Sequence, residues 1–464
     1  MLDEAVIRDV LRMALRSGGR FAEVFAEERR STSIRLDDRR VEELTEGADR
    51  GAGIRVIAAD TTAYAFSNRL DRAALLEAAE AAAAASRGSG ATELVDLRRQ
   101  DPQVAHPPLQ PTADVPRELK VAWVREAEEA ARSQGAEVRQ VVVGYGDSVQ
   151  RLLVASSEGT WVEEERHRVR LIAHVVASRD GVVQTGFDGP AALGGAEVLE
   201  AHPPAATGAE AARMAVTMLD GVPAPAGEMA VVIGPGGGGV LFHEACGHGL
   251  EADTVGKEAS VYRGRLGERL ASPLVSGVDD STLRGGWGSF SFDDEGAPAA
   301  PTALFEDGVL VGMLNDRFWA GKQGAELTAN GRRQSYGHLP IPRMTNTSIL
   351  QGDADPGAIV ADTGRGLYAK TLGGGQVNPA TGDFVFGVSE AYLIEEGKIT
   401  RPVRGANLIG NGIGILAAVD AVAGDFDSRP GTCGKDGQSV PVTTGSPTLR
   451  IARMTVGGTG GSGA

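Results

Sequence analysis

Residues 243–248, His-Glu-Ala-Cys-Gly-His, contain the residue types of a hydrolytic metal site. Histidine nitrogens bind ions such as zinc, and a glutamate directly after the first histidine can accept a proton from the attacking water. In the common form of this motif the histidines are four residues apart, so both lie on one helix face. Here His243 and His248 are five residues apart, which places them about 140° apart on an ideal helix. The motif predicts metal ligands at His243 and His248, with Glu244 as the catalytic base.

This prediction requires an irregular helix. A single π-bulge accommodates one extra residue, restores the common face and is frequent at functional sites. We expect the distortion near Gly247, because glycine tolerates unusual backbone conformations best. Chance matches to so short a pattern are common. A real site is favoured because the chain has only seven histidines and the motif follows a predicted strand and a glycine run.

The third ligand is expected to be a cysteine. Cys433 lies in the glycine-rich segment 431–437, which exposes the thiol and allows close backbone approach. Two histidines and one cysteine, with one position open, form a known kind of catalytic zinc site. We interpret Cys246 as a small packing residue. Glu251 and Asp253 are alternative ligands, since a carboxylate completes several two-histidine sites, but we favour Cys433.

The glycine run over residues 234–239 matches the dinucleotide-binding pattern and lies between a predicted strand and the motif helix. No second parallel strand with an acidic end follows, and the Gly-Lys-Ser/Thr of a phosphate-binding loop is absent from the sequence. The glycines either leave room for a peptide backbone near the metal, with the amides of Gly236 and Gly237 free to bind substrate, or form a tight strand-to-helix turn. Both interpretations remain open.

A polar loop over residues 331–347 supplies three further candidates for substrate binding. Tyr336, His338 and Arg343 each carry a donor that can stabilise an oxyanion or hold a peptide. For any one of them, loop packing or surface charge is the favoured explanation.

The N-terminal half repeats one order of predicted elements. Helical periodicity at residues 3–17 and 71–86 flanks an alternating, antiparallel pattern, and a proline-rich, linker-like segment follows at 101–116. The order then recurs between helices at 118–134 and 208–220. The predicted strands are 22–27, 32–36, 53–58 and 61–66, then 138–144, 150–156, 159–177 and 182–187. We expect an α+β domain over residues 1–222, with helix-flanked antiparallel sheets and a degenerate repeat.

A second break, at residues 221–227, separates this part from a mostly β C-terminal domain over residues 223–464. That domain begins with a strand at 229–233 and carries the motif helix. Its predicted hairpins pair 376–378 with 383–394, and 392–394 with 398–403. The glycine-rich residues 457–464 are expected to form a flexible tail.

Charge and composition exclude several classes of protein. The 464 residues carry a formal net charge of −16 without a long basic cluster, which disfavours binding to nucleic acid or to anionic lipid. No apolar run approaches the length of a membrane span, and the acidic, amphipathic N-terminus lacks the features of a signal peptide. With only two cysteines, we expect no disulfide framework and a cytoplasmic location.

Several segments in the second half carry a family resemblance. They are 241–253, around the metal motif, and 330–340, 343–347, 373–377, 431–439 and 438–441. In these residues and their order, the chain resembles the TldD family of metallopeptidases. The intact metal motif is similar to TldD itself, whereas its partner TldE, also called PmbA, lacks that motif.

The resemblance implies a heterodimer with a TldE-like partner, in which the TldD subunit binds zinc and unfolded peptides are hydrolysed in a closed cavity. By position, it implies that His243, His248 and Cys433 bind the zinc and that Glu244 is the base. Two other functions remain open. One is hydrolysis of an amide in a natural-product or modified-peptide pathway, and the other is a non-catalytic regulatory scaffold.

Overall fold

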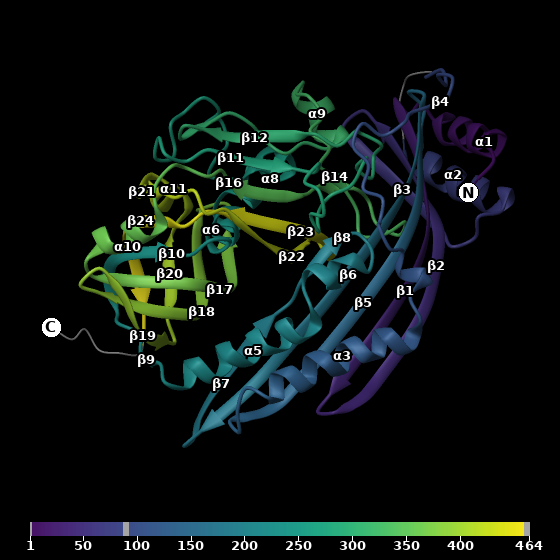
Figure 1. Ribbon diagram of the computed structural model, residues 1–464. Helices are drawn as coiled ribbons and strands as arrows, with labels where there is room; N and C mark the ends of the chain where they lie inside the picture. The colour runs from purple at the N-terminus through teal and green to yellow at the C-terminus, as the bar shows by residue number, and fades with distance from the viewer. Residues whose placement is uncertain (1, 87–91, 459–464) are drawn as a thin grey trace.

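The computed structural model describes residues 2–86 and 92–458 and has the predicted α+β class. Figure 1 shows one long, twisted sheet beside a body made of shorter strands and helices. Of the predicted flexible tail, residues 459–464 lie outside the described residues, whereas Gly457 ends strand β24 (Leu449–Gly457). None of the described helices is long and apolar enough to cross a membrane.

The long sheet joins two units that each run helix, three antiparallel strands, helix. The first unit contains α1 (Glu4–Leu15), β1 (Phe21–Asp37), β2 (Arg40–Ala58), β3 (Thr61–Ser67) and α2 (Arg72–Ala85). The second contains α3 (Arg117–Arg132), β5 (Val138–Ser156), β6 (Thr160–Arg179), β7 (Val182–Asp188) and α5 (Pro204–Leu219). β1 pairs antiparallel with β5, so the units form one sheet of order β3-β2-β1-β5-β6. β4 (Arg98–Arg99), β7 and β8 (Ala191–Leu193) add to β6, and η1 (Thr112–Asp114) and α4 (Glu197–Ala201) lie in the connections.

Two predicted breaks between strands were wrong. Residues 22–27 and 32–36 belong to one strand, β1, and residues 138–144 and 150–156 belong to one strand, β5. The polar residues between them resemble loops. However, β1 is hydrogen-bonded on both sides, to β2 and to β5, so its backbone ladder continues where its side chains are exposed.

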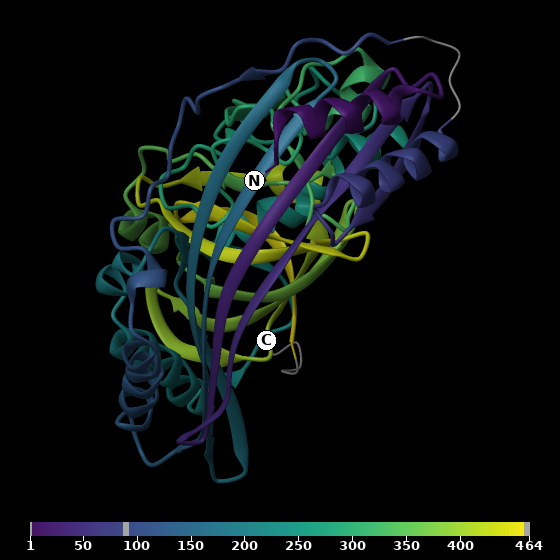
Figure 2. The same cartoon turned by 90° about the vertical axis from the view of Figure 1, so that its right-hand side faces the viewer.

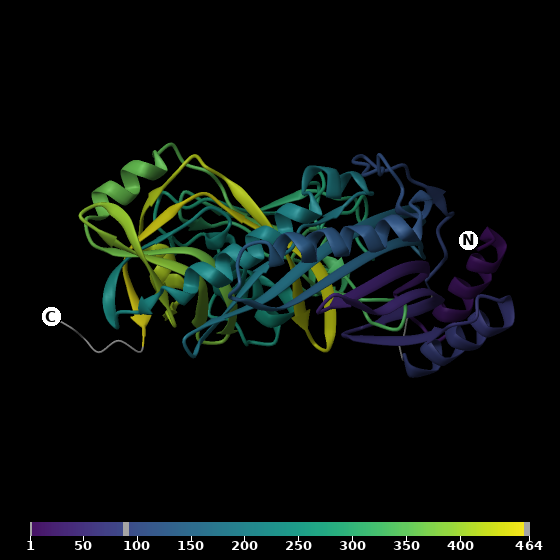
Figure 3. The same ribbon diagram turned by 60° about the horizontal axis from the view of Figure 1, so that its bottom comes forward.

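The helix pairs cover the two ends of one face of this sheet (Figure 2). Val24 of β1 packs with α1 and α2, whereas Ile34, an even number of residues further along, packs with α3 and α5. α3 and α5 lie side by side (Figure 3). A Cβ atom at Gly208 of α5 would lie only 1.8 Å from the carbonyl oxygen of Ala127 in α3, so glycine permits this contact.

A second sheet closes on itself. β10 (Gly227–Ile233) pairs with β17 (Gly366–Asn378) and β24, and β20 (Asn407–Asn411) links β24 to β18 (Asp383–Glu395). β18 pairs back with β17, so these five strands form a small barrel. Both predicted hairpins are confirmed, as β17–β18 and as β18–β19 (Lys398–Arg404). β9 (Val222–Pro223) and β21 (Val419–Val422) add to this sheet.

The third sheet carries the cysteine segment on its edge. Its order is β13 (Val309–Leu310), β12 (Pro301–Glu306), β11 (Gly277–Asp280), β16 (Asn346–Ile349), β23 (Gln438–Ser446) and β22 (Asp427–Lys435). β14 (Gly331–Arg332) pairs with β15 (Ile341–Pro342) nearby. The remaining short helices of the second half are α8 (Ala252–Gly256), α9 (Arg317–Gln323), α10 (Pro356–Thr363) and α11 (Gly412–Ala417), and α10 and α11 contact the second sheet.

Buried charges join the long sheet to the rest of the chain. Arg55 of β2 lies 2.7 Å from Glu23 of β1 and 2.6 Å from Glu295, and Arg333 lies 2.5 Å from Glu23. All four side chains are almost completely buried. Removing one member would leave a buried, uncompensated charge, which costs about 3–5 kcal/mol. The network therefore holds the two parts of the chain in one arrangement.

Candidate metal centre

The metal motif lies in a helical segment that changes its hydrogen-bond pattern. α6 (Gly237–Phe242) leads into the π-helical turn η2 (His243–Gly247), and α7 (His248–Leu250) follows. The backbone N–H of His248 donates to the carbonyl oxygen of His243, five residues earlier. The π-bulge that the spacing required is therefore present. It brings the two imidazole rings to a centroid separation of 5.1 Å.

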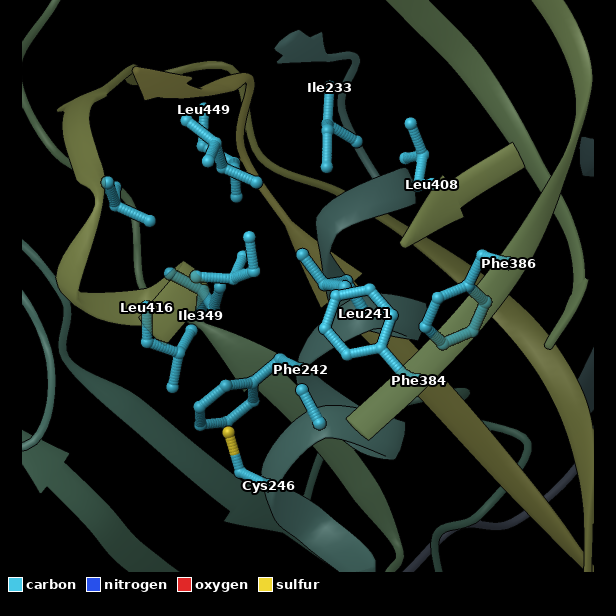
Figure 4. Close-up of a cluster of buried hydrophobic side chains, with 14 of the residues drawn as sticks. Ile233, Leu241, Phe242, Cys246, Ile349, Phe384, Phe386, Leu408, Leu416 and Leu449 are labelled. Atoms are coloured by element: carbon cyan, nitrogen blue, oxygen red, sulfur yellow. The ribbon is translucent and has the colours of Figure 1, made fainter. Parts of the chain in front are cut away.

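Apolar packing determines which side of this segment faces the core. Leu241, Phe242, Cys246 and Leu250 are buried in the largest hydrophobic cluster. Figure 4 shows Leu241, Phe242 and Cys246 among the side chains of this cluster. Cys246 is thus placed as a packing residue, and burial raises the pKa of its thiol to about 12.

Cys433 reaches the histidines from β22. Its Sγ lies 3.3 Å from Nε2 of His243 and 3.5 Å from Nε2 of His248. Within the described residues, these three side chains are the group of potential ligands whose donor atoms all lie within 4.8 Å of one another. Burial alone would raise the pKa of Cys433, but His243 and His248 lower it to about 4. The site therefore favours a thiolate, the form that binds metals.

A tight turn places the thiol. β22 and β23 are joined at Asp436 and Gly437, which have φ angles of 50° and 72°. Two consecutive residues with positive φ are typical of the type I′ turn that closes two-residue hairpins. In this hairpin Cys433 pairs with Val440, and both are buried, so the expectation of an exposed thiol was wrong. The Asp-Gly pair is the sequence signal that predicts such a hairpin.

Glu251 faces the opposite side of the His248 ring from Cys433. Its Oε2 lies 3.0 Å from Nδ1 of His248, while Nε2 of His248 faces the thiol. Oε2 of Glu251 also lies 3.0 Å from Nζ of Lys435. Burial alone would raise the pKa of Glu251, but Lys435 and His248 lower it to about 2. A carboxylate there fixes the orientation of the ring, as partners of metal-binding histidines commonly do.

Asp253 is held by two lysines. Nζ of Lys435 lies 2.5 Å from its carboxylate and Nζ of Lys257 lies 3.3 Å from it. Neither Asp253 nor Glu251 belongs to the ligand group around Cys433. The sequence interpretation did not identify Lys435, although it belongs to the cysteine segment.

Glu244 is the most exposed acidic group beside the cluster. A quarter of its side chain is accessible, and its Oε2 lies 3.8 Å from Nε2 of His248. This carboxylate can therefore contact both solvent and a ligand at the cluster. That position suits a general base.

Arg343 requires a correction, because the structure leaves it no surface with which to hold a substrate. It is fully buried. Its guanidinium donates to the carbonyl oxygens of Cys433, at 2.6 Å, and of Gln438, at 3.3 Å. It therefore supports the hairpin that presents the thiol.

Tyr336 and His338 lie in a loop that contacts the long sheet. The backbone N–H of Tyr336 donates to Glu27, and its hydroxyl donates to Asp49. His338 Nδ1 lies 2.8 Å from the hydroxyl of Ser335. Among the described residues, the hydrogen bonds of these two side chains do not extend to the cluster, so their assignment to substrate binding remains an untested prediction.

The glycine run serves close packing. A Cβ atom at Gly239 would lie 2.3 Å from the backbone nitrogen of Gly445 in β23, and one at Gly237 would lie 2.8 Å from Ile233. Gly236 and Gly237 also line a cavity of about 670 Å³ between α5, β17 and β22. The structure thus supports the strand-to-helix turn and still leaves these two glycines facing a cavity.

Sequence profiles of one family match most of the chain. The PmbA/TldA metallopeptidase domain 1 matches residues 22–86, the central domain matches 110–219, and the C-terminal domain matches 226–458.

Relatives of known sequence extend over nearly the whole chain. A Metalloprotease TldD homolog from Haemophilus influenzae is 38% identical over 449 residues, covering 95% of this chain and 93% of that protein. A protein from Methanothermobacter thermautotrophicus named Metalloprotease is 36% identical and covers 95% and 96%. A Zinc metalloprotease TldD homolog from Saccharolobus solfataricus is 28% identical and covers 70% and 68%.

Two solved structures share the fold. A Thermotoga maritima protein, described as a candidate modulator of a DNA gyrase, matches with a TM-score of 0.82 at 22% identity, covering 98% of this chain and 100% of the other. TldE from Thermococcus kodakarensis matches with a TM-score of 0.77 at 20% identity, covering 97% and 99%. At these identities the similarity establishes the fold alone.

Proposed function

Because this chain belongs to the PmbA/TldA metallopeptidase family, we propose that it is the zinc-binding subunit of a peptidase that hydrolyses unstructured peptides. One observation carries the proposal. The side chains of His243, His248 and Cys433 converge, with the carboxylate of Glu244 beside them. The donors come from two parts of the sequence and meet only in the folded chain.

The donor set fits zinc. Two imidazoles and one thiolate match the ligands that zinc takes in catalytic sites with three protein ligands. The side chains of His243 and Cys433 are buried, and Glu251 already orients His248. When bound, zinc would supply a Lewis acid that polarises the scissile carbonyl and makes a water molecule more acidic.

The protein's own residues would move the proton. Glu244 would accept a proton from the attacking water and return it to the leaving amine, because its carboxylate faces both the cluster and solvent. Glu251 would keep the Nδ1 proton of His248 in place, so that Nε2 remains available. Lys435 would balance the buried charge of Glu251.

An extended peptide suits the edge on which Cys433 lies. β22 is the last strand of its sheet and, among the described residues, pairs with β23 alone. The free edge of a strand presents backbone groups that can bind another extended chain. A folded protein cannot offer such a segment, and the proposed substrates are therefore unstructured.

The proposal includes a TldE-like partner subunit and a cytoplasmic location. A thiolate ligand donates charge to zinc, so the site would gain from a dry enclosure in which fixed dipoles act at low dielectric. A second subunit covering the site would supply that enclosure and exclude folded proteins. Both cysteines are free, which supports a reducing compartment.

The test titrates zinc-loaded chain with a TldE-like partner and assays an unstructured peptide and a folded protein. We expect slow hydrolysis by the chain alone, faster hydrolysis of the peptide with partner, and no cleavage of the folded protein. The Glu244→Gln chain is the matched control. Equal activity without the partner would contradict the heterodimer, and efficient cleavage of the folded protein would contradict the substrate class.

A further inference from the structure

Five arginines surround a cavity of about 200 Å³ between the β22–β23 hairpin and the long sheet. They are Arg29, Arg166, Arg168, Arg332 and Arg333, and one carboxylate, that of Asp294, also lines the cavity. Figure 1 shows this hairpin, in yellow, extending toward the long sheet. A concentration of positive charge is unusual in a chain with a formal net charge of −16. Its position therefore calls for a physical explanation.

Two of these arginines already have carboxylate partners. Arg166 lies 3.0 Å from Glu164 and 2.8 Å from Asp294. Arg333 lies 2.5 Å from Glu23. These two guanidinium groups are neutralised within the fold.

Arg168 and Arg332 differ, because no carboxylate lies within ion-pair distance of either in the described part of the chain. Arg168 donates to the carbonyl oxygens of Trp287 and Ser289, and Arg332 donates to those of Met344 and Pro441. Only 6% of Arg168 and 4% of Arg332 is exposed. These carbonyl oxygens accept hydrogen bonds from two nitrogens of each guanidinium but leave each buried charge without a neutralising partner.

The electrostatics support this reading of the geometry. Burial, and then the neighbouring Arg166, Arg332 and Arg29, lower the pKa of Arg168 well below its usual value. Burial likewise lowers the pKa of Arg332 to about 10. An anion in the cavity would offset the electrostatic cost of burying the charges of Arg168 and Arg332.

The cavity and the metal centre lie on opposite faces of one edge strand. Thr432 lines the cavity, and the next residue, Cys433, faces the histidines. Consecutive side chains of a strand alternate in direction. The side chains of an extended peptide paired with the free edge of β22 would alternate between the same two faces. A peptide bound along the free edge can therefore reach both faces.

We propose that this arginine pocket is a substrate subsite that binds a carboxylate of the peptide, either its C-terminal carboxylate or an Asp or Glu side chain. The proposal rests on the peptidase function proposed above. A guanidinium presents a planar fork of donors that matches the two oxygens of a carboxylate. The volume of about 200 Å³ is large enough for a carboxylate and the side chain or chain end that carries it.

The experiment measures binding, so that it does not depend on turnover. Fluorescently labelled unstructured peptides are titrated by anisotropy against the zinc-loaded full chain carrying Glu244→Gln. One peptide has a free C-terminus, one a C-terminal amide, and one has its acidic side chains replaced by amides. We expect removal of the recognised carboxylate to weaken binding by at least about tenfold, as for one charged hydrogen bond. The modified peptide that loses affinity shows whether the pocket binds the C-terminal carboxylate or an acidic side chain.

Variants separate recognition from folding. In Arg168→Gln the preference for the carboxylate should disappear, whereas in Arg40→Gln, an exposed arginine of β2, it should persist. Arg29→Gln changes an exposed residue at the pocket. It should reduce the preference even if Arg168→Gln does not fold.

Three results would overturn the proposal. One is equal affinity for all three peptides, and another is a uniform loss of affinity for all of them in Arg168→Gln. The third is an unchanged preference in both Arg168→Gln and Arg29→Gln, which would show that the arginines do not recognise the carboxylate. Absence of hydrolysis by the wild-type chain together with its partner would instead contradict the peptidase function, and the binding result would stand.

Discussion

The Nε2 atom of His243 lies 3.3 Å from the Sγ atom of Cys433, although 190 residues separate the two in the sequence. His243 begins a π-helical turn and Cys433 lies on the edge strand of a sheet, so a helical irregularity and a strand edge meet at one point. Two elements must therefore be positioned independently for the cluster to form.

Replacing Cys433 should abolish stoichiometric zinc binding. In Cys433→Ser the hydroxyl is a much weaker ligand than the thiolate that His243 and His248 favour. Elemental analysis of purified protein should give about one zinc per wild-type chain and much less for the variant. Cys246→Ser is the matched control and should retain zinc, because Cys246 packs in the apolar core. The reverse pattern would overturn the ligand assignment.

Metal removal should make Cys433 the reactive thiol. With a pKa of about 4, Cys433 is a thiolate at pH 6, whereas Cys246, with a pKa of about 12, remains protonated. Iodoacetamide at pH 6 should therefore modify Cys433 in chelator-treated protein, and its rate should decline only as the pH approaches 4. Peptide mapping by mass spectrometry measures both sites, and added zinc should protect Cys433. Equal labelling of the two thiols would contradict the assignment of the thiolate to Cys433.

Glu244→Gln should retain fold and zinc but lose hydrolysis. The amide has nearly the same shape as the carboxylate, yet it cannot accept a proton, so turnover should fall by about 10²–10⁴-fold. Peptide cleavage assays and elemental analysis of the same preparation measure both quantities. Turnover close to that of the wild type would show that another group accepts the proton.

Glu251→Gln should weaken metal binding without removing a ligand. The change removes the negative charge that faces Nδ1 of His248 and Nζ of Lys435. Loss of such a partner typically costs about 10–100-fold in metal affinity. Competition with a coloured zinc chelator measures the affinity directly. Glu268→Gln, an exposed control paired with Arg265, should leave it unchanged, and an equal effect of both variants would refute the positioning role of Glu251.

Gly239→Ala should destabilise the fold, because its Cβ would lie 2.3 Å from the backbone of Gly445. Backbone atoms cannot move away cheaply, and overpacking of this kind costs about 1–3 kcal/mol. Gly414→Ala is the control, since this helical glycine has no atoms within 4 Å of the added Cβ. Urea unfolding should show a loss for the first and no loss for the second. Equal stabilities would mean that α6 can shift away from β23.

The sequence alone was sufficient for features that depend on local spacing. The five-residue interval between His243 and His248 required one extra residue in a helical turn, and the π-helix His243–Gly247 confirms it. Alternating and helical periodicity located the helices α1, α2 and α3, and the family that the second half resembles is confirmed. The interval and the periodicities depend on residues within a few positions of one another, and the family resemblance depends on several short motifs and their order along the chain.

Only the tertiary structure decided how distant segments meet. The polar centres of β1 and β5 are strand because each strand pairs with a neighbour far away in the chain, which no local pattern records. Arg343 was a candidate for substrate binding, but the hairpin of Cys433 folds over it and buries its charge against carbonyl oxygens. The position of Cys433 beside His243 likewise depends on strand order and core packing. Such contacts are determined by the free energy of the whole fold, because burial and backbone pairing must be satisfied together.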